Sequence, residues 1–211
     1  MADLLKPLGL AALLALASPA LAQDTGGDAA PAVDDATAAP AADAAPADGQ
    51  PQAYIDEVFN DWSRECVRRP EGSEGDDLCW VTQVLKDDNG RPFGKFSIRR
   101  VPAGSQAVAQ ADVAVSMELV PYLPTGVTLG VDKGLGREYQ YLFCSPVTGC
   151  LVQPNLSAAD IEAFKAGTVL NMGFAIVAKP TELATINSPI SLKGFTAAWE
   201  SVKVPEVPAA Q

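Results

Sequence analysis

The chain has 211 residues, four cysteines and no histidine, and its 15 Lys and Arg against 26 Asp and Glu give a formal net charge of −11. Without an imidazole, Ser-His and Cys-His nucleophile pairs and most zinc and iron sites are excluded. The acidic balance provides no cationic stripe for non-specific nucleic-acid binding. The sequence therefore predicts no nucleic-acid partner, no metal site and no cofactor.

The first 22 residues have the three parts of a secretory signal peptide. Lys6 forms the basic flank, residues 8–17 form an apolar run, and Ala20-Leu21-Ala22 is a small-x-small end. We predict cleavage after Ala22. The run is well short of the roughly 20 residues that span a bilayer, and no later stretch predicts a transmembrane segment. We expect a periplasmic protein, with secretion and outer-membrane association left open.

Residues 23–53 are rich in Ala, Pro and Asp, contain six aspartates, and have no Lys or Arg. Such a segment buries too little apolar area to offset the entropy of ordering it, so we predict a disordered linker. Whether it is a spacer or only a solubilising tail stays open. We predict one domain over residues 54–203 and a loose, Pro-punctuated C-terminal tail over residues 204–211.

Residues 54–62 open the domain with apolar positions at 55, 58, 59 and 62, a spacing that fits one face of a helix. Residues 62–67 alternate like a strand. We expect a short lead-in helix or turn followed by a strand, and then a polar loop over residues 68–77 that returns the chain to Cys79.

Residues 78–101 contain two runs rich in β-branched and aromatic residues on either side of Asp87-Asp88-Asn89-Gly90. Asn-Gly provides the two positive-φ positions that a tight hairpin turn needs. The segment therefore predicts a β-hairpin, and Cys79 at its start can tie it to another part of the chain.

The rest of the domain alternates short strands with turns, and it predicts one helix over residues 157–167. Ser157 is the expected N-cap, Asp160 occupies the capping-box position, and Gly167 ends the helix. Residues 196–201 are expected to be helical or a turn.

Strands are expected over residues 106–120, 127–132, 139–144, 168–179 and 187–195. Short strands with regular turns predict a mainly β fold, an antiparallel β-sandwich with one short helix, stapled by two disulfides.

The four cysteines form an even set in a chain predicted to be exported, so we expect them to pair. Sequence proximity favours Cys66 with Cys79 and Cys144 with Cys150. The chain-entropy model gives about 3 and about 2.4 kcal/mol for the loops of 14 and 7 residues that these bridges close. A redox-active dithiol is the alternative, but neither spacing is Cys-x-x-Cys.

Two basic pairs, Arg68-Arg69 and Arg99-Arg100, lie in or next to the hairpin region. They are candidates for a patch that binds an anionic partner, although loop and strand-edge arginines are usually only solubilising. The acidic residues of the loops, Asp76, Asp77, Asp87 and Asp88, are read as solvated turn residues. Trp62, Trp80 and Trp199 are read as core or disulfide-packing aromatics rather than a ligand platform. We predict no catalytic residues.

Several motifs together resemble the invasion-associated locus B family of exported Gram-negative bacterial proteins. They are Trp62-x-x-x-Cys66, Cys79 followed by Val81-Thr82-Gln83, Cys144-x5-Cys150, and Ser191-Leu192-x-Gly194-Phe195-Thr196-Ala197-Ala198. The likeness covers about residues 55–201. It implies a periplasmic or envelope-associated β domain without enzymatic activity, and it offers no catalytic residues to transfer.

We therefore expect a non-enzymatic binding protein of the envelope or of host interaction, with an unknown protein or envelope component as its partner. The alternative is a carboxylate-dependent hydrolase of an envelope glycan, which needs two acidic side chains facing each other in a pocket at roughly 5–10 Å. A thiol-disulfide exchanger is a third possibility, and it needs an easily reduced pair.

Overall fold

The computed structural model of the protein describes residues 53–70, 72, 75–102 and 104–205. The predicted signal peptide and the predicted linker up to residue 52 lie outside the described residues, as does the predicted tail from residue 206. Ala53, assigned above to the linker, is the first residue of a strand.

The first sheet is assembled mainly from the N-terminal half of the domain. Its path runs β1-β2-β3-β4-β5-β9-β8, and the short β10 also pairs with β5. These strands are β1 (Ala53–Phe59), β2 (Trp62–Val67), β3 (Leu78–Lys86), β4 (Pro92–Arg100), β5 (Ala109–Val115), β8 (Phe143–Ser145), β9 (Gly149–Val152) and β10 (Asn155–Leu156).

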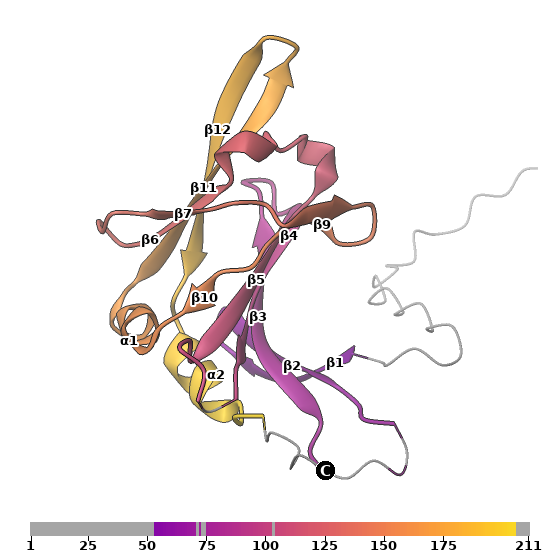
Figure 1. Cartoon of the computed structure of the whole chain (residues 1–211), viewed down its shortest axis with the longest axis vertical. Coiled ribbons are helices and arrows are strands. Elements are labelled where there is room, and N and C mark those ends of the chain that lie inside the picture. The colour runs from indigo at the N-terminus through magenta and orange to yellow at the C-terminus, as the bar shows by residue number, and fades with distance from the viewer. Residues whose placement is uncertain (1–52, 71, 73–74, 103, 206–211) are drawn as a thin grey trace, which may run out of the picture. The chain divides into compact units, whose positions relative to one another are not determined.

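The second sheet has the order β12-β11-β6-β7, and its β11–β12 hairpin extends well beyond its other strands (Figure 1). Two α-helices and two short 3-10 helices complete the described part of the chain. The elements are η1 (Met117–Leu119), η2 (Leu123–Thr125), β6 (Val127–Val131), β7 (Arg137–Tyr139), α1 (Ala158–Ala166), β11 (Val169–Lys179), β12 (Glu182–Ser191) and α2 (Phe195–Ser201).

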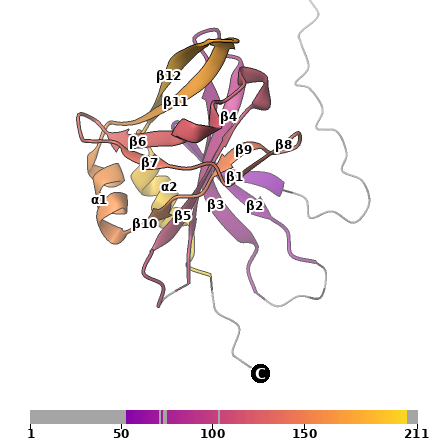
Figure 2. The same cartoon turned by 45° about the horizontal axis from the view of Figure 1, so that its top comes forward.

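All strand pairs within both sheets are antiparallel. The predicted mainly β, antiparallel architecture is therefore confirmed, although there are two short helices instead of one. Figure 2 shows the two sheets as separate layers, with α1 and α2 near the same end of the domain.

A single apolar core joins the sheets and the helices. Its aromatic centre is Phe195 of α2, whose ring centroid lies 5.1 Å from that of Trp62, 5.6 Å from that of Phe164 and 6.2 Å from that of Trp199. Trp62 also meets Phe96 of β4. Both Trp62 and Trp199 are buried, as expected for core aromatics. Trp80 is only half-buried and lies outside the core, on the outer face beside Glu65. The core thereby fixes α2 against the inner face of the first sheet.

The structure contains the predicted helix cap and both predicted disulfides. Ser157 and Asp160 form the reciprocal capping box of α1. Cys66 is bonded to Cys79 and Cys144 to Cys150, the two pairs that sequence proximity favours. The cysteines of each pair lie directly opposite each other on neighbouring strands. Each bridge therefore also holds a strand register.

Two local predictions were wrong. Residues 54–59 are a strand and not a helix or turn, because β1 forms a hairpin with β2 around Asn60, which has φ +55°. The turn after β3 is wider than a two-residue turn. Only Gly90 has positive φ there, Gly90 N–H donates to Asp87 O (2.8 Å), and Asp87 N–H donates to Arg91 O (2.9 Å).

Three predicted strands also have different limits. The strand expected over residues 106–120 spans only Ala109–Val115, because the chain turns into η1 after Ser116. The one expected over residues 139–144 is divided between β7 and β8, which belong to different sheets. The last strand begins at Glu182 and ends at Ser191, since β12 pairs along most of β11.

Candidate functional site

The candidate site is a pocket of about 480 Å³ on the outer face of the first sheet, away from the core. Strand alternation creates it. Trp62, Val81 and Phe96 point into the core, so Glu65 and Lys95, at positions of opposite parity, point outward. The pocket is lined by Ile55, Asp61, Ser63, Glu65, Thr82, Gln83, Val84, Lys86 and Lys95.

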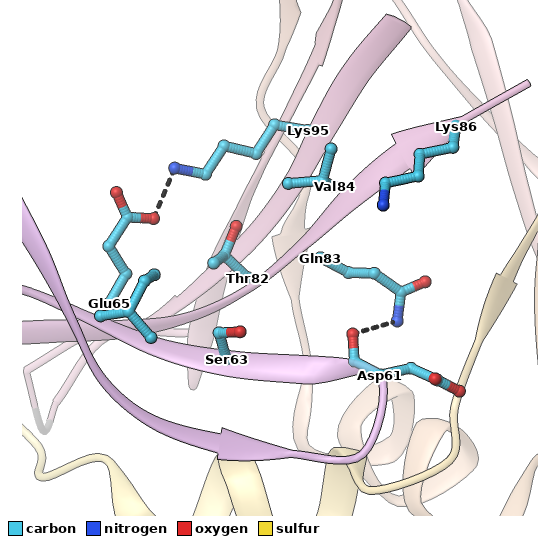
Figure 3. A pocket seen from close by; sticks show the side chains of 9 residues that line it. Asp61, Ser63, Glu65, Thr82, Gln83, Val84, Lys86 and Lys95 are labelled. Atoms are coloured by element: carbon cyan, nitrogen blue, oxygen red, sulfur yellow. Dashed lines mark hydrogen bonds and ion pairs between the residues drawn. The ribbon is translucent and has the colours of Figure 1, made fainter. Parts of the chain in front are cut away.

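Glu65 is the centre of the polar network in this pocket, and its side chain is only 12% exposed. The same carboxylate oxygen accepts from Lys95 Nζ and, at 3.2 Å, from Trp80 Nε1. Glu65 lies on β2 and Lys95 on β4, so their ion pair crosses the strand between them, as Figure 3 shows. The negative charge of Glu65 is therefore matched within the site.

Hydroxyl and amide groups hold the floor and one end of the pocket. Thr82 Oγ1 lies 3.0 Å from Ser97 Oγ and donates to Phe96 O at 3.3 Å. Gln83 Nε2 donates to Asp61 O (3.0 Å) and to Ser191 O (3.1 Å). Gln83 thereby connects the β1–β2 turn to the end of β12, and this end of the pocket is set by hydrogen bonds.

The four arginines considered above do not converge on one site, and none of them lines the pocket. Arg99 pairs with Asp112 on the neighbouring strand (2.7 Å). Arg100, next along the strand, points to the opposite face, where its guanidinium lies 4.2 Å from the ring centroid of Trp199. Burial lowers the pKa of Arg100, and the negative charge of Glu200 acts in the opposite direction.

Arg68 and Arg69 belong to a separate cluster beside the Cys66–Cys79 bridge. Arg68 lies over the ring of Tyr54, and Tyr54 Oη donates to Asp77 Oδ2 at 2.7 Å. This hydrogen bond raises the pKa of Tyr54 and, with a second one from Arg69 N–H, lowers the pKa of Asp77. The cluster joins β1 to the loop before β3, and binding of an anionic partner by the arginines stays a prediction.

The acidic side chains of the pocket are not arranged as a facing pair. Asp61 and Glu65 both line it. In Figure 3 the Asp61 carboxylate points away from Glu65, and Ser63 and Thr82 lie between them. Within the described residues, no group of three or more Cys, Asp or Glu side chains is placed to hold a metal ion.

Sequence reasoning missed Glu65, Lys95 and Trp80 as a cluster, although two signals were present. The Cys66–Cys79 bridge fixes a register in which Glu65 is opposite Trp80. The Asn89-Gly90 signal, taken as a two-residue turn, predicts Val84 opposite Lys95. The observed turn is wider, but the register shift between Leu85 and Lys86 restores this pairing. Together these registers place the three side chains on one face.

The family follows from comparison with known proteins. A model of the family described as "Invasion associated locus B (IalB) protein" matches residues 62–203, more than half of the chain. The chain belongs to the invasion-associated locus B family. Among solved structures it resembles invasion associated protein B from Bartonella henselae, with a TM-score of 0.54 and 23% identity over 68% of this chain and 91% of that chain. This likeness shows the fold alone. No curated protein matches the chain.

The motifs that resemble the invasion-associated locus B family mostly build the core around the site. Trp62 Nε1 donates to Ser191 O at 2.8 Å, which joins the first motif to the last. Gly194 has φ +90°, and a Cβ there would lie 2.0 Å from Phe59 O. Of the motif residues, Thr82 and Gln83 also line the pocket. The family-like residues therefore position the pocket more than they line it.

Proposed function

We propose that this member of the invasion-associated locus B family is an exported, non-enzymatic binding protein of the cell envelope. Its binding site is the pocket on the outer face of β1–β4. The observation that carries this proposal is the pairing of Glu65 with Lys95 and Trp80 in an open pocket. Paired polar groups beside the exposed aliphatic side chains of Ile55 and Val84 suit recognition of a surface with both polar and apolar groups.

The same geometry favours binding over hydrolysis. A glycosidase needs one carboxyl group free to donate a proton and a second that acts as nucleophile or base. Glu65 is engaged by a lysine and an indole N–H, and Asp61 is directed elsewhere. The site therefore lacks the opposed carboxyl groups from which the hydrolase alternative was built.

Placement in the envelope is supported by the signal-peptide pattern of residues 1–22 and by family membership. Two disulfides suit an oxidising compartment such as the periplasm. In the described ranges no helix is long and apolar enough to cross a membrane. The partner is then a component of the periplasm, the outer membrane or the cell exterior.

The test uses a substitution that blocks the pocket and a control with the same exposure elsewhere. Val84 lines the pocket and Leu183 lies on β12, and both are 49% exposed on strands. Val84→Trp and Leu183→Trp are produced as exported, disulfide-bonded proteins and cross-linked in intact envelopes. Recovered components are identified by mass spectrometry and then titrated against the purified protein.

We expect the wild-type protein and Leu183→Trp to recover the same component and to bind it directly with equal affinity. Val84→Trp should bind it at least about tenfold more weakly, which corresponds to about 1.4 kcal/mol. If both variants bind the component equally well, the binding site does not lie in this pocket. Failure of the wild-type protein to bind any envelope component would contradict the proposal as a whole.

A further inference from the structure

The edges of the two sheets differ in how they are protected from pairing with another strand. Exposed edges usually carry charged residues or proline, which make pairing with a foreign strand unfavourable. Three of the four strands that end the sheet paths carry such residues. β8 (Phe143–Ser145) carries none, and of these protections it has only its short length of three residues. The protecting residues are Asp56 and Glu57 on β1, Arg137 and Glu138 on β7, and Glu182 and Pro189 on β12.

The β8–β9 hairpin lies in the longest uncharged part of the domain's sequence. Residues 139–159 contain no Asp, Glu, Lys or Arg, although the whole chain has a net charge of −11. Figure 2 shows this hairpin projecting from the side of the domain. An approaching strand would therefore meet no charge on β8 or on the turn that follows it.

The backbone of β8 is also held in a geometry that suits pairing. Cys144 lies opposite Cys150 with a Cα–Cα distance of 3.9 Å, the close spacing of a non-hydrogen-bonded antiparallel pair. In such a pair, the N–H and C=O of Cys144 point away from β9 and toward the free edge. Because the disulfide closes the hairpin, little conformational entropy remains to be lost when a strand adds to this edge.

Apolar side chains accompany this open edge. Leu142 and Phe143 are exposed, and Val147 at the turn is 96% exposed. We call these three residues the β8 patch. A three-residue strand offers few backbone hydrogen bonds, so a stable contact at this edge also needs burial of the β8 patch.

We propose that β8 is a self-association edge, on which a second copy of this chain pairs its own β8 antiparallel about a two-fold axis. A two-fold contact is self-complementary, so each copy contributes its own β8 patch and the apolar area buried is doubled. The rest of the domain is net acidic, with 14 Lys and Arg against 19 Asp and Glu after residue 53. Contacts between copies at other surfaces therefore bring like charges together, and this uncharged edge does not.

The chain's own N-terminal segment fits the edge less well. Residues 23–52 contain Pro31, Pro40, Pro46 and Pro51. Proline has no N–H to donate to a ladder, and the segment has almost no large apolar side chain to cover the β8 patch. A second copy is the better match in both backbone and side-chain chemistry.

The test is sedimentation velocity on the full exported protein, with its disulfides intact, over concentrations up to about 1 mM, the range of weak association. Val147→Lys and Phe143→Lys each place a charge on the edge. Leu135→Lys is the matched control, because Leu135 is 99% exposed in the loop between β6 and β7. Unchanged near-UV circular dichroism checks folding, and Leu142→Lys replaces any variant that fails this check.

We expect a concentration-dependent monomer–dimer equilibrium for the wild-type protein and for Leu135→Lys. Val147→Lys and Phe143→Lys should each weaken the dimer by at least about tenfold. A photo-reactive residue at position 147 should cross-link two copies of the chain. The proposal is overturned if the wild-type protein is monomeric over the whole range, if the edge variants dimerise as well as the control, or if only a different protein cross-links at position 147.

Discussion

The two faces of β2, β3 and β4 are built from alternating residues of the same strands, yet they are fixed by different forces. On the inner face, Trp62, Val81 and Phe96 are fully buried in the core. On the outer face, Glu65 and Lys95 are held by an ion pair beside an open pocket. Neighbouring residues on one strand thus belong to the core on one side and, on the other, to the pocket proposed above as a binding site.

This division makes the two roles separable by mutation. Apolar packing contributes several kcal/mol for each large side chain, whereas an ion pair open to solvent contributes about 1 kcal/mol or less. Inner-face substitutions should therefore change the free energy of unfolding with little effect on specificity. Outer-face substitutions should change binding while the fold persists.

The largest expected effect is that of Phe96→Ala on the inner face. Phe96 is fully buried and packs edge-on against Trp62, so its loss leaves a cavity in the aromatic centre. We expect a decrease of about 3–5 kcal/mol in the free energy of unfolding. Val84→Ala, on the outer face of the neighbouring strand, should change it by about 0.5 kcal/mol or less. Urea unfolding under non-reducing conditions measures both, and similar losses at the two positions would show that the faces are not distinct.

A smaller effect is expected where α2 joins the inner face. Gly194→Ala combines a positive φ with a clash between the new Cβ and the backbone at Phe59 O, so about 3 kcal/mol should be lost. Gly90→Ala is the matched control, because Gly90 has φ +77° with open space around it, and about 1 kcal/mol should be lost there. Equal melting temperatures for the two variants would show that the close approach of Gly194 to β1 does not exist in solution.

The sequence was sufficient for features that depend on neighbouring residues. The capping box at Ser157 and Asp160 and the alternation over Ala109–Val115 are local patterns, and each has one interpretation. The two disulfides join cysteines that are close in the sequence, and sequence proximity was enough to predict them. These features specify a stapled antiparallel fold without any knowledge of the second sheet's order.

The prediction from sequence failed at β1, because a register shift there interrupts the two-residue periodicity of a strand. The register of β1 shifts between Ile55 and Glu57, so that Asp56 is an extra residue opposite β2. This bulge places Ile55 and Val58 three residues apart on one face, a spacing that also fits a helix. The pocket was missed for a different reason. Glu65 and Lys95 are 30 residues apart, and only the combined registers of three strands bring them together.

The burial of Tyr141, which packs against the core, can be tested through the pH dependence of unfolding. Burial raises the pKa of Tyr141 to about 12, against about 10 in an unfolded chain. The unfolded state therefore loses this proton first as the pH rises. The stabilising contribution is complete below about pH 10 and should be lost between about pH 10 and 12. We expect Tyr141→Phe to remove this part of the pH dependence of urea unfolding, and an unchanged slope in the variant would contradict the burial of the phenol group.

The smallest expected effect is the coupling between Glu65 and Lys95 on the outer face. In a double-mutant cycle with Glu65→Gln and Lys95→Met, the Gln amide oxygen can still accept from Trp80, so the cycle isolates the charge pair. We expect about 0.5–1 kcal/mol, decreasing at high salt. The exposed pair Lys179–Glu182 at the β11–β12 turn is the reference and should couple more weakly, because its charges stay in water. A coupling at Glu65 no larger than this reference would mean that the pocket does not strengthen this ion pair beyond that of an exposed pair. A larger coupling would show that the partial burial of Glu65 strengthens its ion pair with Lys95.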